Sequence, residues 1–160
     1  MAKQKRRKFD YDQDFKTLDF RVQPEKYQVG IGEQGVLLVE PYKSEILPHW
    51  RFKTPEIALE SSQKIYQIFL EYKKQSDFAG MDMARKFLQM GYTRARRYAN
   101  HPGGRKYDKK SGAELPGDLD VEKAESAAIF YEKYVKARED PKYQNLKKAH
   151  VEKYEMEEVS

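Results

Sequence analysis

The chain has 160 residues, of which 39% are hydrophobic, 13% aromatic and 36% charged, with no cysteine and a formal net charge of +5. This length suits one domain with one core, and the aromatic content is too high for a disordered protein. The composition excludes disulfides, thiolate metal sites and thiol nucleophiles, and residues 35–39, the longest apolar run, are far fewer than the roughly 20 that span a bilayer.

The positive charge is concentrated in two segments. Residues 1–8 carry five bases and no acid, residues 83–110 carry nine bases and one acid, and the rest of the chain is acidic on balance. Concentrated basic segments favour a surface that attracts an anion, whereas a dispersed excess affects solubility alone. We interpret residues 1–8 as a flexible basic arm, which either adds sequence-independent attraction to a polyanion or is a solubilising tail. The N-terminus lacks the apolar core of a signal peptide, so we expect a cytoplasmic protein that does not enter a membrane.

Residues 27–52 carry the signals of β-strands. A short apolar run is followed by three glycines and then by a second, β-rich run, so we predict a small N-terminal β-hairpin over residues 27–39. The same region holds Glu33, Glu40 and His49, whose side chains are suited to general acid–base catalysis. The alternative is a solvated polar rim around the hairpin.

Several helices have clear start signals. Thr54 precedes Pro55, Asp120 precedes an apolar stripe, and Pro141 opens a segment rich in Lys and Glu. We therefore predict an α+β fold, mainly α, in which the hairpin packs on four or five helices. Residues 9–138 form a single globular domain, and residues 139–160 form a charged C-terminal helix.

The segment between these helices combines an apolar stripe with arginines. A helix that starts at Asp77 can close at Gly91, and Thr93 can cap a second helix. This is the layout of a helix-turn-helix, whose second helix enters the major groove of DNA. Arg94 and Arg97, one turn apart, are placed to contact bases or phosphates. Three interpretations remain open: readout of DNA sequence, phosphate contact without sequence preference, and an exposed basic helix with no ligand.

A loop must follow, because Pro102 and two glycines cannot continue a helix. Glycine N–H groups, basic side chains and a tyrosine ring suit a phosphate and a stacked base, and His101 is a further candidate proton donor. The candidate phosphate-binding residues are Arg85, Lys86, Arg94, Arg96, Arg97, Gly103, Gly104, Arg105, Lys106 and Tyr107.

Two stretches carry a resemblance to a known family. They are G-E-Q-G-V-L-L-V-E-P-Y-K-S-E-I-L-P-H-W-R-F-K-T-P-E-I-A, from Gly32, and G-M-D-M-A-R-K-F-L-Q-M-G-Y-T-R-A-R-R-Y-A-N-H-P-G-G-R-K-Y, from Gly80. They resemble an uncharacterised family of small proteins in bacteria, some algae and large tailed phages, including those of cyanobacteria, which is catalogued as a domain of unknown function. The resemblance covers roughly residues 9–137. It implies an intracellular protein and no particular activity, cofactor or catalytic residue.

The basic segment leads us to predict a nucleic-acid-binding protein, with DNA favoured over RNA and with no cofactor or bound metal. One alternative is an enzyme that acts on a nucleotide or nucleic acid, with Glu33, Glu40 and His49 facing the basic loop. Another is an interaction protein whose basic face docks an acidic protein partner. The sequence does not fix the oligomeric state.

Overall fold

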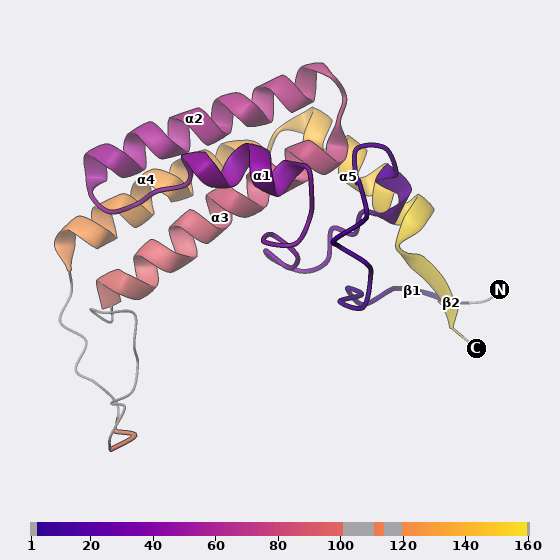
Figure 1. Cartoon of the computed structure of the whole chain (residues 1–160), viewed down its shortest axis with the longest axis horizontal. Helices are drawn as coiled ribbons and strands as arrows, with labels where there is room; N and C mark the ends of the chain where they lie inside the picture. Colours follow the sequence, from indigo (N-terminus) through magenta and orange to yellow (C-terminus); the bar gives the residue numbers. More distant parts are fainter. Residues whose placement is uncertain (1–2, 101–110, 114–119, 160) are drawn as a thin grey trace.

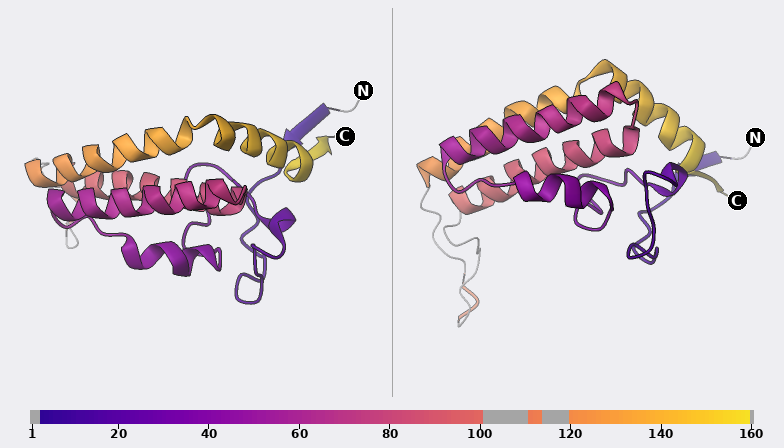
Figure 2. Two further views of the ribbon diagram at one scale, coloured as in Figure 1. Left: turned by 90° about the horizontal axis from the view of Figure 1, so that it is seen from above. Right: turned by 45° about the horizontal axis from the view of Figure 1, so that its top comes forward.

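The computed structural model describes residues 3–100, 111–113 and 120–159 (Figure 1). Three long helices lie side by side as a bundle: α2 (Pro55–Lys74), α3 (Phe78–Asn100) and α4 (Val121–Arg138). Helix α5 (Pro141–Tyr154) follows α4 after a bend, and Figure 2 shows the short helix α1 (Tyr42–Ile46) on the side of the bundle away from α4. Two 3-10 turns, η1 (Pro24–Lys26) and η2 (Leu47–His49), complete the helical elements of the described residues.

The helix starts predicted at Thr54, Asp120 and Pro141 are confirmed. Thr54, Asp120 and Asp140 are the N-caps of α2, α4 and α5, and each side chain accepts a hydrogen bond from the backbone N–H three residues later. These caps satisfy N–H groups that have no partner inside the helix. The starts of these three helices are thus fixed by contacts within four residues of sequence.

A two-stranded antiparallel sheet joins the two ends of the chain. Strand β1 (Lys3–Arg6) pairs with β2 (Met156–Val159), with Arg6 opposite Met156. The predicted class is confirmed, since the fold is mainly helical with a small antiparallel sheet that includes an N-terminal strand. Strand β1 lies within the segment that the sequence predicts to be a flexible arm.

The predicted position of the hairpin is wrong, because residues 27–39 form turns and no strand. Gly30, Gly32 and Gly35 have φ values of +66°, +62° and +80°, which bend the backbone repeatedly instead of once. At Gly35 an added Cβ would lie 2.4 Å from the ring of Phe9, so this glycine also allows close packing. We call residues 27–36 the glycine segment. Three of its backbone oxygens, those of Gln28, Gly32 and Gln34, accept hydrogen bonds from side chains of α3 and not from a second strand.

The predicted helix-turn-helix is also wrong. Helix α3 runs without a break through Gly91, and Thr93 lies inside it instead of at an N-cap. A Cβ at Gly91 would lie 2.3 Å from Cδ1 of Phe130 in α4. Gly91 therefore allows two helices to approach closely, and it does not end the first one.

The core lies between α2, α3 and α4 and extends to the glycine segment and α5. It is rich in aromatic rings, and α5 contributes Tyr143 and the partly polar His150 to it. The Phe78 ring packs against both of these rings in a tilted arrangement, with centroid distances of 5.8 Å to Tyr143 and 5.0 Å to His150. Within the described part of the chain, no helix has the length and apolar character needed to cross a membrane.

Candidate functional site

Helices α3 and α4 and the segment before α2 bring cationic side chains to one end of the bundle. The start of α2, the end of α3 and the start of α4 meet there, at the left of Figure 1. We call this region the basic end and define it by Arg51, Lys53, Arg94, Arg96, Arg97 and Lys123. Sequence reasoning identified the three residues from α3, and the fold adds the other three.

The arginines of α3 are held on the open side of the helix. Ala95 and Ala99 are buried, so helical spacing leaves Arg94 and Arg97 exposed and Arg96 partly exposed. Among the described residues, none of the three makes an ion pair or a side-chain hydrogen bond. Their guanidinium donors are available to an external acceptor, and a guanidinium suits the bidentate binding of phosphate.

A hollow of about 510 Å³ lies at the basic end. It is lined by two aromatic rings, one aliphatic side chain and three cations: Phe52, Tyr98, Ile57, Arg51, Lys53 and Lys123. The Phe52 and Tyr98 ring centroids are 5.9 Å apart, with an angle of 37° between the ring planes. Lys123 Nζ donates a hydrogen bond to the Lys53 carbonyl oxygen at 2.7 Å and lies 5.7 Å from the centre of the Phe52 ring. We call this hollow the aromatic pocket.

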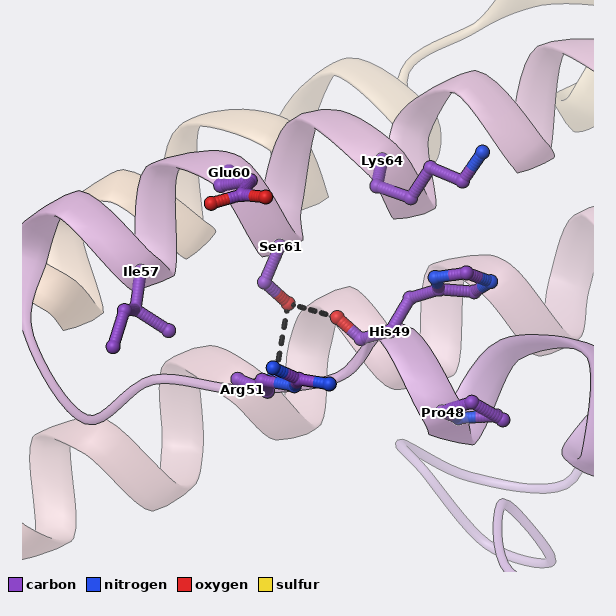
Figure 3. Close-up of a pocket in the computed structure, with 7 residues that line it drawn as sticks. All are labelled: Pro48, His49, Arg51, Ile57, Glu60, Ser61 and Lys64. Carbon is purple, nitrogen blue, oxygen red and sulfur yellow. Dashed lines mark hydrogen bonds between the residues drawn. The ribbon is translucent and has the colours of Figure 1, made fainter.

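A smaller hollow of about 170 Å³ adjoins the aromatic pocket, with Arg51 and Ile57 lining both. Figure 3 shows Ser61 at its centre, where its hydroxyl donates to the His49 carbonyl oxygen at 2.6 Å and accepts from the Arg51 backbone N–H at 3.0 Å. The His49 ring and the Lys64 ammonium lie toward one side of the hollow. Because the Ser61 hydroxyl is engaged in fixing the chain before α2, it is not arranged as a nucleophile.

The candidate catalytic carboxylates and His49 do not form one site. Glu33 accepts a hydrogen bond from the Thr93 hydroxyl at 3.2 Å, whereas Glu40 accepts from the backbone and hydroxyl of Ser44 at the start of α1. No hydrogen bond or ion pair joins Glu33, Glu40 and His49 in the described residues. Burial raises the pKa of Glu33, although the Thr93 hydroxyl and the charge of Arg94 oppose that shift. In the described part of the chain, no group of three or more acidic or imidazole side chains could hold a metal ion.

The prediction that Arg85 and Lys86 contact an external phosphate is wrong, because both side chains are buried. Arg85 is 5% exposed and Lys86 is 0% exposed. Arg85 donates to the carboxylate of Asp82 at 2.6 Å and to the Gly32 carbonyl oxygen at 2.6 Å. Lys86 donates to the Gln34 carbonyl oxygen at 2.6 Å. Both cations therefore hold the glycine segment against α3.

Asp82 is the counter-charge of this buried cluster. Its carboxylate accepts hydrogen bonds from the hydroxyls of Tyr27 and Tyr143, each at 2.5 Å, and its second oxygen lies 3.7 Å from Lys86 Nζ. Burial acts to raise the pKa of Asp82, but the charges of Arg85 and Lys86 and the two hydroxyls outweigh it and hold the pKa at about 2. Burial also lowers the pKa of Lys86 to about 8, against the opposing attraction of Asp82. The cluster therefore has a structural role: it connects α3 to the glycine segment inside the core.

The remaining candidate residues lie outside the described part of the chain. They are His101, Gly103, Gly104, Arg105, Lys106 and Tyr107. Helix α3 ends at Asn100 and α4 begins at Val121, so the segment that contains them joins two helix ends at the basic end. Their proposed contact with phosphate stays a prediction.

Sequence reasoning missed Arg51, Phe52, Lys53 and Lys123 as members of a candidate site. The run R-F-K, residues 51–53, alternates cations with an aromatic ring, a pattern typical of nucleic-acid-binding surfaces, and it was a usable signal. Lys123 carries no comparable signal, because only the packing of α4 beside α2 places it at the pocket.

Comparisons with known proteins place the chain in a family without naming an activity. A family model described as a domain of unknown function (DUF4385) matches residues 10–153. No curated protein and no solved structure matches the chain. Any statement about function therefore depends on the geometry of the described residues.

Proposed function

The chain belongs to this family of unknown function, DUF4385, and we propose that it binds nucleic acid through the basic end. The observation that carries the proposal is the set of three arginines on α3 that have no ion pair or side-chain hydrogen bond among the described residues. Cations that are not engaged in ion pairs and are gathered on one surface attract a polyanion and can neutralise its phosphates.

The position of these arginines on a packed helix supports the same proposal. Helix α3 contacts both α2 and α4, and Gly91 and Phe130 bring α3 and α4 into close contact. Arg94 and Arg97 therefore project from a rigid surface, so ordering the backbone at the moment of binding costs little free energy. Rigid placement suits repeated phosphates at a fixed spacing.

Phosphate contact is the mode of binding that the geometry supports best. Because α3 is continuous through Gly91, this helix has no turn that would present a separate recognition helix to the major groove. Arginine contacts to phosphate fix position on the nucleic acid and carry no sequence information directly. We therefore propose binding with little sequence preference, to DNA or RNA.

The proposal predicts that Arg94→Ala combined with Arg97→Ala weakens binding to labelled DNA and RNA oligonucleotides by about 10- to 100-fold at low salt. The physical reason is that a hydrogen bond contributes about 0.5–1.5 kcal/mol net, so that losing two costs roughly 1–3 kcal/mol, and both side chains lie outside the core. The measurement is fluorescence anisotropy with the purified full chain, together with thermal unfolding to verify that the variant is folded.

The matched control is Lys136→Ala combined with Lys148→Ala. This variant removes the same charge from exposed positions on α4 and α5, away from the basic end. We expect it to bind nucleic acid within about threefold of the wild type, since scattered surface charge has a small effect across a screened distance. Equal losses in the two variants would show that net charge, and not the basic end, governs binding.

A further inference from the structure

We infer that the aromatic pocket takes an unpaired base of the bound nucleic acid, so that the protein prefers single strands to duplexes. This inference rests on the proposed function and adds to it the form of nucleic acid that is bound. It depends on side chains other than the arginines of α3, namely Phe52, Tyr98 and the residues around them.

The first observation is the pair of aromatic rings at the opening. Phe52 and Tyr98 are both partly exposed, and both line the pocket. A third ring, that of Trp50, packs against Phe52, with the two ring centroids 5.1 Å apart. An aromatic ring held by its neighbours and open on one side is a surface on which a base can stack, and any of the bases can do so because each has a π-face.

The second observation is the charge around these rings. Arg51, Lys53 and Lys123 line the pocket, and none of the described residues that line it is acidic. Lys123 is held beside Phe52 by hydrogen bonds to two backbone oxygens. Arg51 and Lys53 are exposed at the rim of the pocket. Three cations around two aromatic rings favour a ligand that is both aromatic and negatively charged. A base that is linked to phosphates on both sides has this combination.

The third observation is the position of the pocket relative to the arginines of α3. Tyr98 is four residues after Arg94 and directly follows Arg97, so Arg94 and Tyr98 share one face of the helix. A strand with a phosphate bound to Arg94 would therefore run past Tyr98, which lines the pocket. Bases in a duplex are stacked on one another and cannot offer a face to Tyr98, whereas an unpaired base can.

The test compares two oligonucleotides of about 12 nucleotides, one of thymidines and one with the same backbone but no bases. The wild type should bind the thymidine strand at least about fivefold more tightly, because one stacked base contributes that much affinity or more. In Tyr98→Leu this ratio should fall by at least about fivefold, while affinity for the strand without bases stays unchanged. Tyr98→Phe keeps the ring and should keep the ratio.

The outcomes separate this inference from the proposed function. If the wild type binds the two strands equally and in a salt-dependent manner, the phosphate contact stands and the base pocket is refuted. If Tyr98→Leu leaves the ratio unchanged while remaining folded, the pocket is likewise refuted. If the wild type binds neither strand at low salt, both proposals fail. Repeating the titration with uridine strands tests whether RNA occupies the same pocket, and tighter binding of a duplex than of either single strand would contradict the inference.

Discussion

Asp82 is the residue on which most of the polar core depends. Its side chain is fully buried and compensates two buried cations, Arg85 and Lys86, that connect α3 to the glycine segment. Breaking a buried ion pair by removing one partner is costly, because the other charge stays buried without compensation. Arg85 and Lys86, which the sequence predicted to bind phosphate, are thus buried and bind Asp82 and the glycine segment instead.

The variant Asp82→Asn should lower the free energy of unfolding by about 3–5 kcal/mol, since it leaves Arg85 and Lys86 without their carboxylate. Urea unfolding at neutral pH, followed by circular dichroism, measures this loss. The control is Glu71→Gln, which removes an exposed ion pair with Lys74 and should cost less than about 1 kcal/mol. Equal and small losses for the two variants would contradict the assigned role of Asp82.

Lys86 gives the core a predicted dependence on pH. Its pKa of about 8 in the folded chain lies below the ordinary value of 10.5, so between these values the unfolded chain binds the proton more strongly. The free energy of unfolding therefore rises with pH wherever the unfolded state holds more protons. The contribution of Lys86 is least favourable below about pH 8 and improves as the pH rises toward 10.

The measurement compares wild type with Lys86→Met in urea at pH 7.5, 8.5 and 9.5. The stability of the wild type relative to the variant should increase by about 1–2 kcal/mol across this range, because one pKa unit corresponds to about 1.4 kcal/mol. Burial raises the pKa of Tyr27 and of Tyr143 in the folded chain, so both hydroxyls stay protonated in this range. A relative stability that does not change with pH would mean that Lys86 titrates normally.

At the scale of elements, α3 depends on a glycine that brings it close to α4. Replacing Gly91 by Ala improves helix propensity by about 1 kcal/mol, but the new methyl group would meet Phe130 at 2.3 Å. Overpacking of this kind costs about 1–3 kcal/mol. We therefore predict that Gly91→Ala destabilises the protein in thermal unfolding.

A second substitution tests the cause of that loss. In the background of Phe130→Leu, which removes the ring that the methyl group meets, Gly91→Ala should cost less than it does alone or should even stabilise the chain. If Gly91→Ala stabilises the otherwise wild-type protein, then Gly91 is not a site of close helix contact.

The elements that could be predicted from sequence are those whose causes are local. The caps at Thr54, Asp120 and Asp140 act within four residues, and the helix starts predicted at Thr54, Asp120 and Pro141 are confirmed. The glycine segment could not be predicted, because its backbone oxygens bond to Arg85 and Lys86, more than 50 residues later. The pattern of glycines with β-branched residues is typical of hairpins, and nothing in it indicates that side chains from a helix replace the second strand.

At the scale of the whole molecule, the charge counted along residues 83–110 overestimates the number of cations at the surface. Two of the nine bases in residues 83–110, Arg85 and Lys86, are internal. The fold in turn gathers cations from α3, α4 and the segment before α2 at the basic end. Among them are Arg51 and Lys123, which are far apart in sequence and line the same pocket. The candidate site is therefore partly predictable: the exposed arginines of α3 follow from helical spacing, and the aromatic pocket does not.

The far end of the molecule is closed by contacts between the chain ends. Glu155, which is fully buried, accepts hydrogen bonds from the backbone N–H groups of Val29 and Gly30 and lies 3.6 Å from Arg6. Arg6 belongs to β1, so part of the N-terminal basic segment also serves the fold. The three arginines of α3 at the basic end, in contrast, make no ion pair or side-chain hydrogen bond among the described residues.

The most direct test of nucleic-acid binding is the dependence of affinity on salt concentration for single-stranded and duplex DNA. If all six cations of the basic end neutralise phosphates, the slope of log affinity against log salt should be about −4 for single strands and about −5 for duplexes. In Arg94→Ala/Arg97→Ala the slope should become shallower by about 1.4 and about 1.8, respectively. A slope near zero in the wild type, or the same slope in the wild type and the variant, would contradict binding through the basic end.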